Sequence, residues 1–143
     1  MRRAVSQSVV HWEAAQAALA AAVQKAEALG VKVNVAVVDS GGNLAGFLRM
    51  PGAFLHSIDI AIDKAYTAAG FGMPTGDWPR ILQESPPAVR DGLPRRPRVV
   101  AFGGGFPIEV DGERIGAIGV SGGSEQEDEQ CARAGLEAIN AAD

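Results

Sequence analysis

The stretch from Gly112 to Ala134 constrains the fold most, because it predicts a strand, a turn and a helix in direct succession. Asp111-Gly112 is a typical hairpin turn. The apolar run from Ile115 to Val120 predicts a strand, which Ser121-Gly122-Gly123 interrupts. The spacing in Ser124-Glu125-Gln126-Glu127 is that of a capping box, so we expect a helix to begin there.

The turn after this strand also has the composition of an anion site. Backbone amides just ahead of a helix can hold a negative group. A second glycine cluster precedes the neighbouring predicted strand, so the two turns can form one amide-lined pocket. The candidate substrate-binding residues are therefore Gly103, Gly104, Gly105, Ser121, Gly122, Gly123 and Ser124. The alternative is that these residues only turn the chain tightly, and the spacing matches neither a P-loop nor a dinucleotide fingerprint.

The composition predicts one globular domain spanning residues 1–143. An apolar content of 47% and a charged content of 21% argue against disorder, and a net charge of −4 argues against nucleic-acid binding. The single Cys131 excludes an intrachain disulfide and a multi-cysteine zinc site. Because we find neither an apolar run of about 20 residues nor a signal peptide, we expect a cytoplasmic protein without a membrane partner.

The order of the predicted elements indicates an α+β fold. Helices are expected over residues 9–29, 54–69, 75–84 and 125–141, and strands over residues 31–39, 44–50, 98–102, 106–110 and 115–120. The order is therefore α-β-β-α-(α)-β-β-β-α, and the short turns between strands force antiparallel pairing. Residues 85–98 contain four prolines and four arginines and are predicted to form a loop. Its positive charge suits an anionic small molecule or an acidic patch on another subunit.

Three charged residues are candidates for binding or catalysis. Arg49 ends a predicted strand, where its guanidinium can grip a carboxylate or simply be solvated. Lys64 lies near Asp59 and Asp63 on the second predicted helix, a pattern typical of a surface ion pair. A desolvated Lys64 would instead be a binding group or a proton carrier. Asp128 is a candidate general acid or base, although the helix dipole alone favours acids in a first turn.

The two histidines and the cysteine give weaker signals. His11 and His56 lie early in the first and second predicted helices, and either is a candidate axial haem ligand or lone metal ligand. The alternative is an ordinary surface or core histidine, and the spacing favours no closed metal site. We interpret Cys131 as a small buried residue, because no histidine lies beside it to lower its thiol pKa.

Four separated segments resemble, in the right order, the GlcG/HbpS-like family, which is related to the C-terminal domain of PduO. They are VNVAVVDSGGNLAGFLRMPGA, SIDIAIDKAYTAAGFGMPT, GGGFPIEVDGERIGAIGVSGG and EQEDEQCARAGLEAI. The resemblance covers residues 9–139 and implies an antiparallel five-stranded sheet flanked by helices, in a homo-oligomer. It also implies a choice of ligands: some members bind haem or are described as haem-degrading, and others belong to pathways for small organic acids or aromatic compounds, including an imine-hydrolysing deaminase.

These features predict a small-molecule-binding protein or enzyme that acts on a carboxylated small organic compound. Arg49 and the amides of residues 121–124 would hold the carboxylate. Lys64 or Asp128 would carry the proton in imine or enamine hydrolysis, or in a tautomerisation. The alternative is a non-catalytic haem-binding or haem-sensing protein, with haem as the candidate cofactor. A structural oligomer without a ligand is a third hypothesis.

Overall fold

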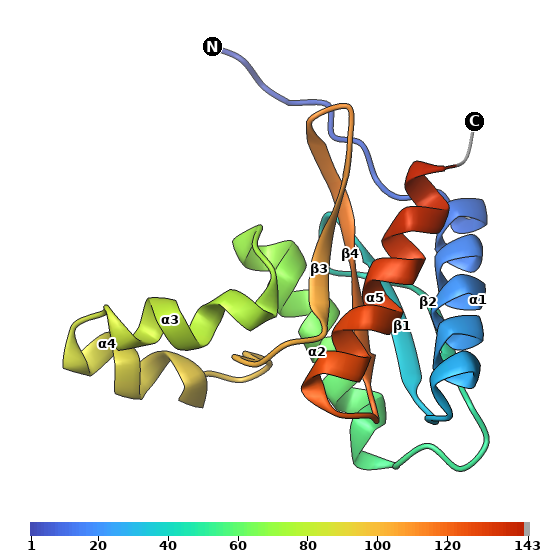
Figure 1. Ribbon diagram of the computed structural model, residues 1–143. Coiled ribbons are helices and arrows are strands. Elements are labelled where there is room, and N and C mark those ends of the chain that lie inside the picture. The colour runs from blue at the N-terminus through green and yellow to red at the C-terminus, as the bar shows by residue number, and fades with distance from the viewer. Residues whose placement is uncertain (142–143) are drawn as a thin grey trace.

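The computed structural model describes residues 1–141 and has an α+β fold built on one antiparallel sheet (Figure 1). The strands lie in the order β2-β1-β4-β3. Their bounds are Asn34–Asp39 for β1, Leu44–Arg49 for β2, Gly105–Val110 for β3 and Glu113–Ser121 for β4. The helices of the described part are α1 Trp12–Leu29, α2 His56–Phe71, α3 Trp78–Gln83, α4 Pro87–Gly92 and α5 Glu125–Asn140. Two 3-10 turns, Thr75–Asp77 and Leu93–Arg95, accompany α3 and α4.

Helices cover both faces of the sheet, with α1 and α5 on one face and α2 on the other (Figure 1). Alternate side chains of β1 point to opposite faces of the sheet, as in any β-strand. Val35 and Val37 pack with α1 and α5, whereas Ala36 and Val38 pack with α2. This double burial explains why β1 is almost continuously apolar.

Small residues let α2 approach the sheet closely. Ala61, Ala65 and Ala69 form one stripe of α2, and all three are buried. On the sheet, Gly119 of β4 lies directly beneath this stripe, and a Cβ at that position would collide with the carbonyl oxygen of Ala61. The contact therefore depends on the absence of a side chain at position 119.

The prediction of five strands is wrong: among residues 1–141 the sheet has four strands, and residues 98–102 are not one of them. A side chain of α2 makes the backbone hydrogen bonds that a neighbouring strand would have made with residues 98–102. The Thr67 hydroxyl donates to the carbonyl of Arg98 at 2.9 Å and accepts from the amide of Val100 at 3.1 Å. Because a side chain satisfies these backbone groups, this segment needs no neighbouring strand.

The proline- and arginine-rich segment 85–98 is also more ordered than the predicted loop, because it contains α4 and the turn Leu93–Arg95. Prolines occupy the first turn of both, where a missing amide costs no hydrogen bond. With α3 this segment forms an arm that projects from the sheet (Figure 1). The arm returns to α2 through Arg98, whose Nε lies 3.0 Å from Asp63 and whose guanidinium stacks 3.5 Å above the ring of Tyr66.

Side-chain caps begin both terminal helices, α1 and α5. The capping box of Ser124 and Glu127 at the start of α5 is confirmed. At the start of α1 the cap is His11, and the Ser8 amide donates to Glu113. Trp12, the first residue of α1, is 62% exposed. None of the helices in residues 1–141 is both long and apolar enough to cross a membrane.

Gly119→Ala is expected to lower the free energy of unfolding by about 2 kcal/mol or more, because the new methyl group would overpack the α2–β4 contact. Gly70→Ala is the matched control, since Gly70 lies in α2 and no atom comes within 4 Å of an added Cβ. This control is expected to stabilise the fold by about 0.5–1 kcal/mol. Urea unfolding measures both changes, and an unchanged midpoint for Gly119→Ala would contradict the close packing.

Candidate functional site

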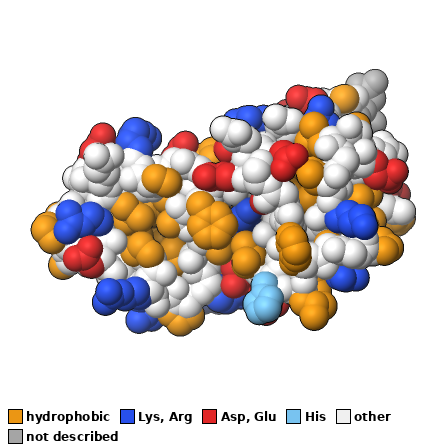
Figure 2. Space-filling view, turned by 60° about the horizontal axis from the view of Figure 1, so that its bottom comes forward, with side chains coloured by type: hydrophobic (Ala, Val, Ile, Leu, Met, Phe, Trp, Pro, Cys, Tyr) orange, Lys and Arg blue, Asp and Glu red, His pale blue; other side chains and the backbone are white. Residues whose placement is uncertain are grey.

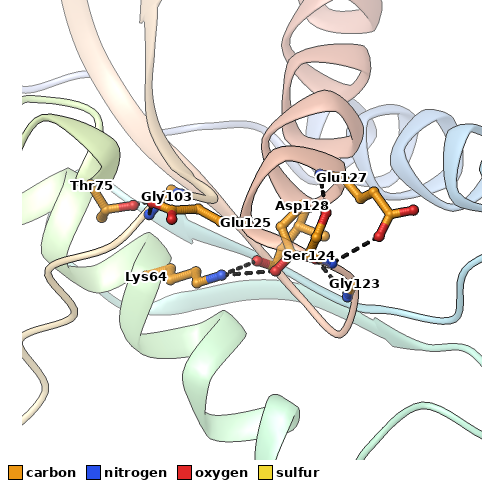
Figure 3. A network of polar contacts seen from close by, with 10 residues as sticks. Lys64, Thr75, Gly103, Gly123, Ser124, Glu125, Glu127 and Asp128 are labelled. Carbon is orange, nitrogen blue, oxygen red and sulfur yellow. Dashed lines mark hydrogen bonds and ion pairs between the residues drawn. The ribbon is translucent and has the colours of Figure 1, made fainter.

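The centre of the candidate site is a buried ion pair between Lys64 of α2 and Asp128 of α5 (Figure 3). The Lys64 Nζ lies 3.1 Å from Asp128 Oδ2 and also donates to the carbonyl of Val120 at 2.8 Å. The two side chains are only 1% and 4% exposed. The structure thus brings together the two residues that the sequence analysis named as candidate proton carriers.

Burial changes the proton affinity of both groups. Desolvation lowers the pKa of Lys64, against the attraction of Asp128, Glu125 and Glu129. Desolvation also raises the pKa of Asp128, against the attraction of Lys64 and the amide bond from Gly123. The two shifts bring the proton affinities of the amine and the carboxylate closer together. A proton can therefore pass between the two members of the pair more easily than between an exposed lysine and an exposed aspartate.

The glycine turn before α5 fixes the carboxylate of the pair. The Gly123 amide donates to Asp128 Oδ1 at 2.8 Å, and the Ser124 amide donates to Glu127 at 2.9 Å. Both bonds use the chain's own carboxylates (Figure 3). The turn that resembles an anion cradle therefore already holds anions, and binding of an external carboxylate there stays a prediction.

The second glycine cluster lies beside the first, as the sequence analysis expected. The Val120 amide donates to the carbonyl of Gly104 at 2.9 Å. The Gly103 amide donates to Glu125 at 2.6 Å, and the Gly105 amide to the Thr75 hydroxyl at 2.9 Å. A Cβ on Gly104 would lie 2.6 Å from the Lys64 Nζ. This cluster thus lets the backbone pass directly over the lysine amine.

Arg49 lies on the same face of the sheet as α2, two strands away from Ser121. Both residues pair with Asn34 of β1, so the three side chains share one face. The guanidinium of Arg49 donates to the carbonyl of Ala53 at 2.7 Å and so braces the turn before α2. Arg49 and the Lys64–Asp128 pair therefore belong to neighbouring regions, and a shared substrate remains a prediction.

The sequence analysis missed three residues that shape this region. The ring of Phe102 lies over the Lys64 amine, with the Nζ 5.1 Å from its centroid. Thr75 is fully buried and holds Gly105. Asn34 is fully buried, and within the described residues its Oδ1 has no hydrogen-bond partner. The sequence could have indicated Asn34, because it is a polar residue inside the apolar run Val33–Val38. The role of Phe102 depends on tertiary contacts, which the sequence does not show.

The remaining candidates are separate from the pair. His11 is the N-cap of α1 and His56 is the exposed first residue of α2. Cys131 is buried, and desolvation raises the pKa of its thiol to about 11, consistent with a small buried residue. Among residues 1–141 we find no group of three or more His, Cys, Asp or Glu side chains arranged to hold a metal ion.

The chain belongs to the HbpS-like family, because the family described as "Haem degrading protein HbpS-like" matches residues 10–137. This match confirms the family that the four sequence segments indicated. A relative within the matches is corrinoid adenosyltransferase PduO of Salmonella typhimurium, 39% identical over 122 residues. The matched region covers 84% of this chain but only 36% of PduO, so the chain corresponds to one part of that protein.

Solved structures share the whole fold. The crystal structure of Klebsiella pneumoniae protein ORFY has a TM-score of 0.92 at 33% identity, covering 100% of this chain and 99% of that chain. The crystal structure of the PduOC:heme complex has a TM-score of 0.85 at 35% identity, covering 92% of this chain and 96% of that chain. A sheet flanked by these helices is therefore common to the chain and its relatives.

Lys64→Met is expected to cost about 3–5 kcal/mol of unfolding free energy, because it leaves the Asp128 carboxyl buried without its partner. Asp128→Asn in the Lys64→Met background should recover part of this loss, since the amide carries no charge. Urea unfolding of the two single variants and the double variant gives a coupling energy, expected at about 1–3 kcal/mol. Strictly additive effects would show that the two side chains do not interact.

Proposed function

We propose that this chain is a haem-binding protein and that haem binds at the turn before α2. The observation that carries the proposal is the composition of residues 54–56, where Phe54, Leu55 and His56 follow one another and are all exposed. An imidazole can ligate haem iron, and apolar side chains beside it can cover a porphyrin face. Figure 2 shows a histidine side chain among exposed apolar side chains on this side of the molecule.

The apolar part of this surface needs an explanation. Phe54 is 69% exposed and Leu55 is 73% exposed, although both are large hydrophobic residues. Two such residues side by side on a surface are typical of a binding site for an apolar ligand. A haem ring would remove this area from water.

Basic side chains at the same turn suit the haem propionates. Arg49 donates to the carbonyl of Ala53, and Lys32 lies against Gly52, where an added Cβ would be 3.0 Å from its Nζ. Both side chains belong to exposed residues. A guanidinium and an ammonium beside an apolar patch favour a ligand that is apolar in its centre and anionic at its edge.

His11 fits an iron ligand less well than His56. Its Nδ1 accepts a hydrogen bond from the Glu13 amide at 3.2 Å, which caps α1. The proton of a neutral ring then lies on Nε2, the nitrogen that would face an iron. Ligation through His11 would therefore require the cap to break.

A haem complex of a relative supports the proposal. The PduOC structure is described as a complex with haem, and that protein is 35% identical to this chain over nearly the whole fold. The family description also refers to haem degradation. We propose binding alone for this chain, because the turn before α2 offers a ligand and a docking surface.

His56→Ala is expected to weaken binding of ferric haem by about tenfold or more, equal to about 1.4 kcal/mol. A titration followed at the Soret band measures the affinity. His11→Ala is the matched control and should bind as the wild type does, with the same Soret position. Equal affinity of His56→Ala and the wild type, or loss of binding only in His11→Ala, would overturn the assignment of His56.

A second candidate function is binding or conversion of a carboxylated small organic compound, and the buried Lys64–Asp128 pair favours it. Imine or enamine hydrolysis and tautomerisation all need a group that gives a proton and a group that takes it. A lysine and an aspartate in hydrogen-bond contact, with opposing pKa shifts, supply both. In this proposal Arg49 holds the carboxylate.

Arg49→Ala is expected to weaken binding of a small carboxylate such as glyoxylate by about tenfold, because one charge-assisted contact is lost. Amide chemical shifts in an NMR titration report the affinity. Arg114→Ala is the control, since Arg114 lies near Gly72, at the other end of α2. Identical titrations for Arg49→Ala and the wild type would remove Arg49 from the site.

A further inference from the structure

The Lys64–Asp128 pair has properties that a purely structural contact does not need. Lys64 is among the largest fully buried side chains of the described residues. Burying two ionisable groups costs more free energy than their attraction commonly returns, and apolar residues of similar size often do as well. The haem site proposed above uses neither residue. The pair is therefore a candidate for chemistry of its own.

The cover over the Lys64 amine is thin. On one side lies the ring of Phe102, which is 47% exposed, and on another lies the backbone of Gly104. Phe102 directly precedes Gly103, Gly104 and Gly105, and glycines allow large backbone rotations. A change of the Phe102 rotamer would uncover the side of the amine on which this ring lies.

We propose that Lys64 is an amine nucleophile that forms an imine with a small aldehyde or ketone admitted beneath Phe102. The Asp128 carboxyl, 3.1 Å from the Nζ, serves as the proton donor and acceptor of this reaction. The inference goes beyond both proposed functions, since it assigns a covalent role to Lys64 and a class of uncharged carbonyl substrates to the pair. It does not depend on haem or on Arg49.

The reaction balances with the groups present. The lone pair of the neutral Lys64 amine attacks the carbonyl carbon, and the Asp128 carboxyl gives its proton to the carbonyl oxygen. The nitrogen then returns one proton to Asp128, which leaves a neutral carbinolamine. Asp128 next protonates the hydroxyl group, the C–O bond breaks, and water departs. The products are a protonated imine on Lys64 and the Asp128 carboxylate, which remain paired.

The surroundings select the kind of carbonyl compound. Glu125 and Glu129 of α5 also face the lysine, and with Asp128 they make this end of the site acidic. Acidic neighbours repel an anionic substrate and stabilise a protonated imine. The enclosed position of the amine admits only small molecules. An uncharged aldehyde of two or three carbons therefore fits better than a carboxylate.

Reductive trapping with acetaldehyde and cyanoborohydride tests the proposal. The chain has only three lysines, Lys25, Lys32 and Lys64, so mass spectrometry of peptides resolves each one. Near pH 6.5 an ordinary lysine amine is almost wholly protonated, whereas burial lowers the pKa of Lys64 and leaves more of its amine neutral. Lys64 should be alkylated at least about tenfold faster than either exposed lysine, since the neutral fraction falls tenfold per pH unit below the pKa.

Two variants test separately the access of the aldehyde to Lys64 and the proton transfer by Asp128. Phe102→Ala removes the cover and should accelerate alkylation of Lys64, with Lys25 and Lys32 unchanged. Asp128→Asn removes the proton donor and should slow alkylation of Lys64 by about tenfold or more. Circular dichroism confirms that each variant is folded. Alkylation of Lys64 at or below the rate of the exposed lysines, in both the wild type and Phe102→Ala, would overturn the proposal.

Failure of Lys64 as a nucleophile is distinguishable from failure of the second proposed function. Acetaldehyde has no carboxylate, so its reaction with Lys64 is independent of Arg49. Arg49→Ala is expected to leave the alkylation rate of Lys64 unchanged. Absence of glyoxylate binding together with rapid alkylation of Lys64 would reject only the carboxylate site at Arg49. Glyoxylate binding without alkylation of Lys64 would reject Lys64 as a nucleophile.

Discussion

The ion pair between Lys64 and Asp128 connects the three elements on which the rest of the structure depends. It links α2 to α5 directly and to β4 through the carbonyl of Val120. The pair forms only because glycines remove side chains from its path: Gly104 passes over the amine and Gly123 donates to the carboxylate. Close packing of α2 on β4 and the glycine turns are thus conditions for this one buried contact.

Both proposed sites lie at the end of the sheet where α2 and α5 begin (Figure 1). The exposed turn before α2 offers Phe54, Leu55 and His56 to a flat apolar ligand, whereas the covered Lys64 amine suits a small one. The two surfaces differ in charge as well, since Lys32 and Arg49 border the first and α5 supplies carboxylates to the second. One fold can therefore present two ligands with different chemistry at one end.

Local patterns in the sequence predicted most of the helices and strands, because a capping box and a hairpin turn each depend on a few neighbouring residues. Four separated segments indicated the family. The other features of the fold and the site depend on tertiary contacts. Residues 98–102 are not a strand because Thr67, from a distant helix, bonds their backbone. The sequence analysis named Lys64 and Asp128 as candidates, yet a lysine near Asp59 and Asp63 is typical of a surface. The burial of Lys64 depends on glycines of two other segments, Gly104 and Gly105 in one and Gly119 of β4 in the other.

A crystal structure of the chain grown with ferric haem tests the proposed function most directly. The iron is expected on Nε2 of His56, with the porphyrin against Phe54 and Leu55 and the propionates toward Lys32 and Arg49. The Lys64–Asp128 pair should remain closed in this complex, since haem does not use it. Iron bound to His11, or to any group remote from the turn before α2, would contradict the proposed haem site.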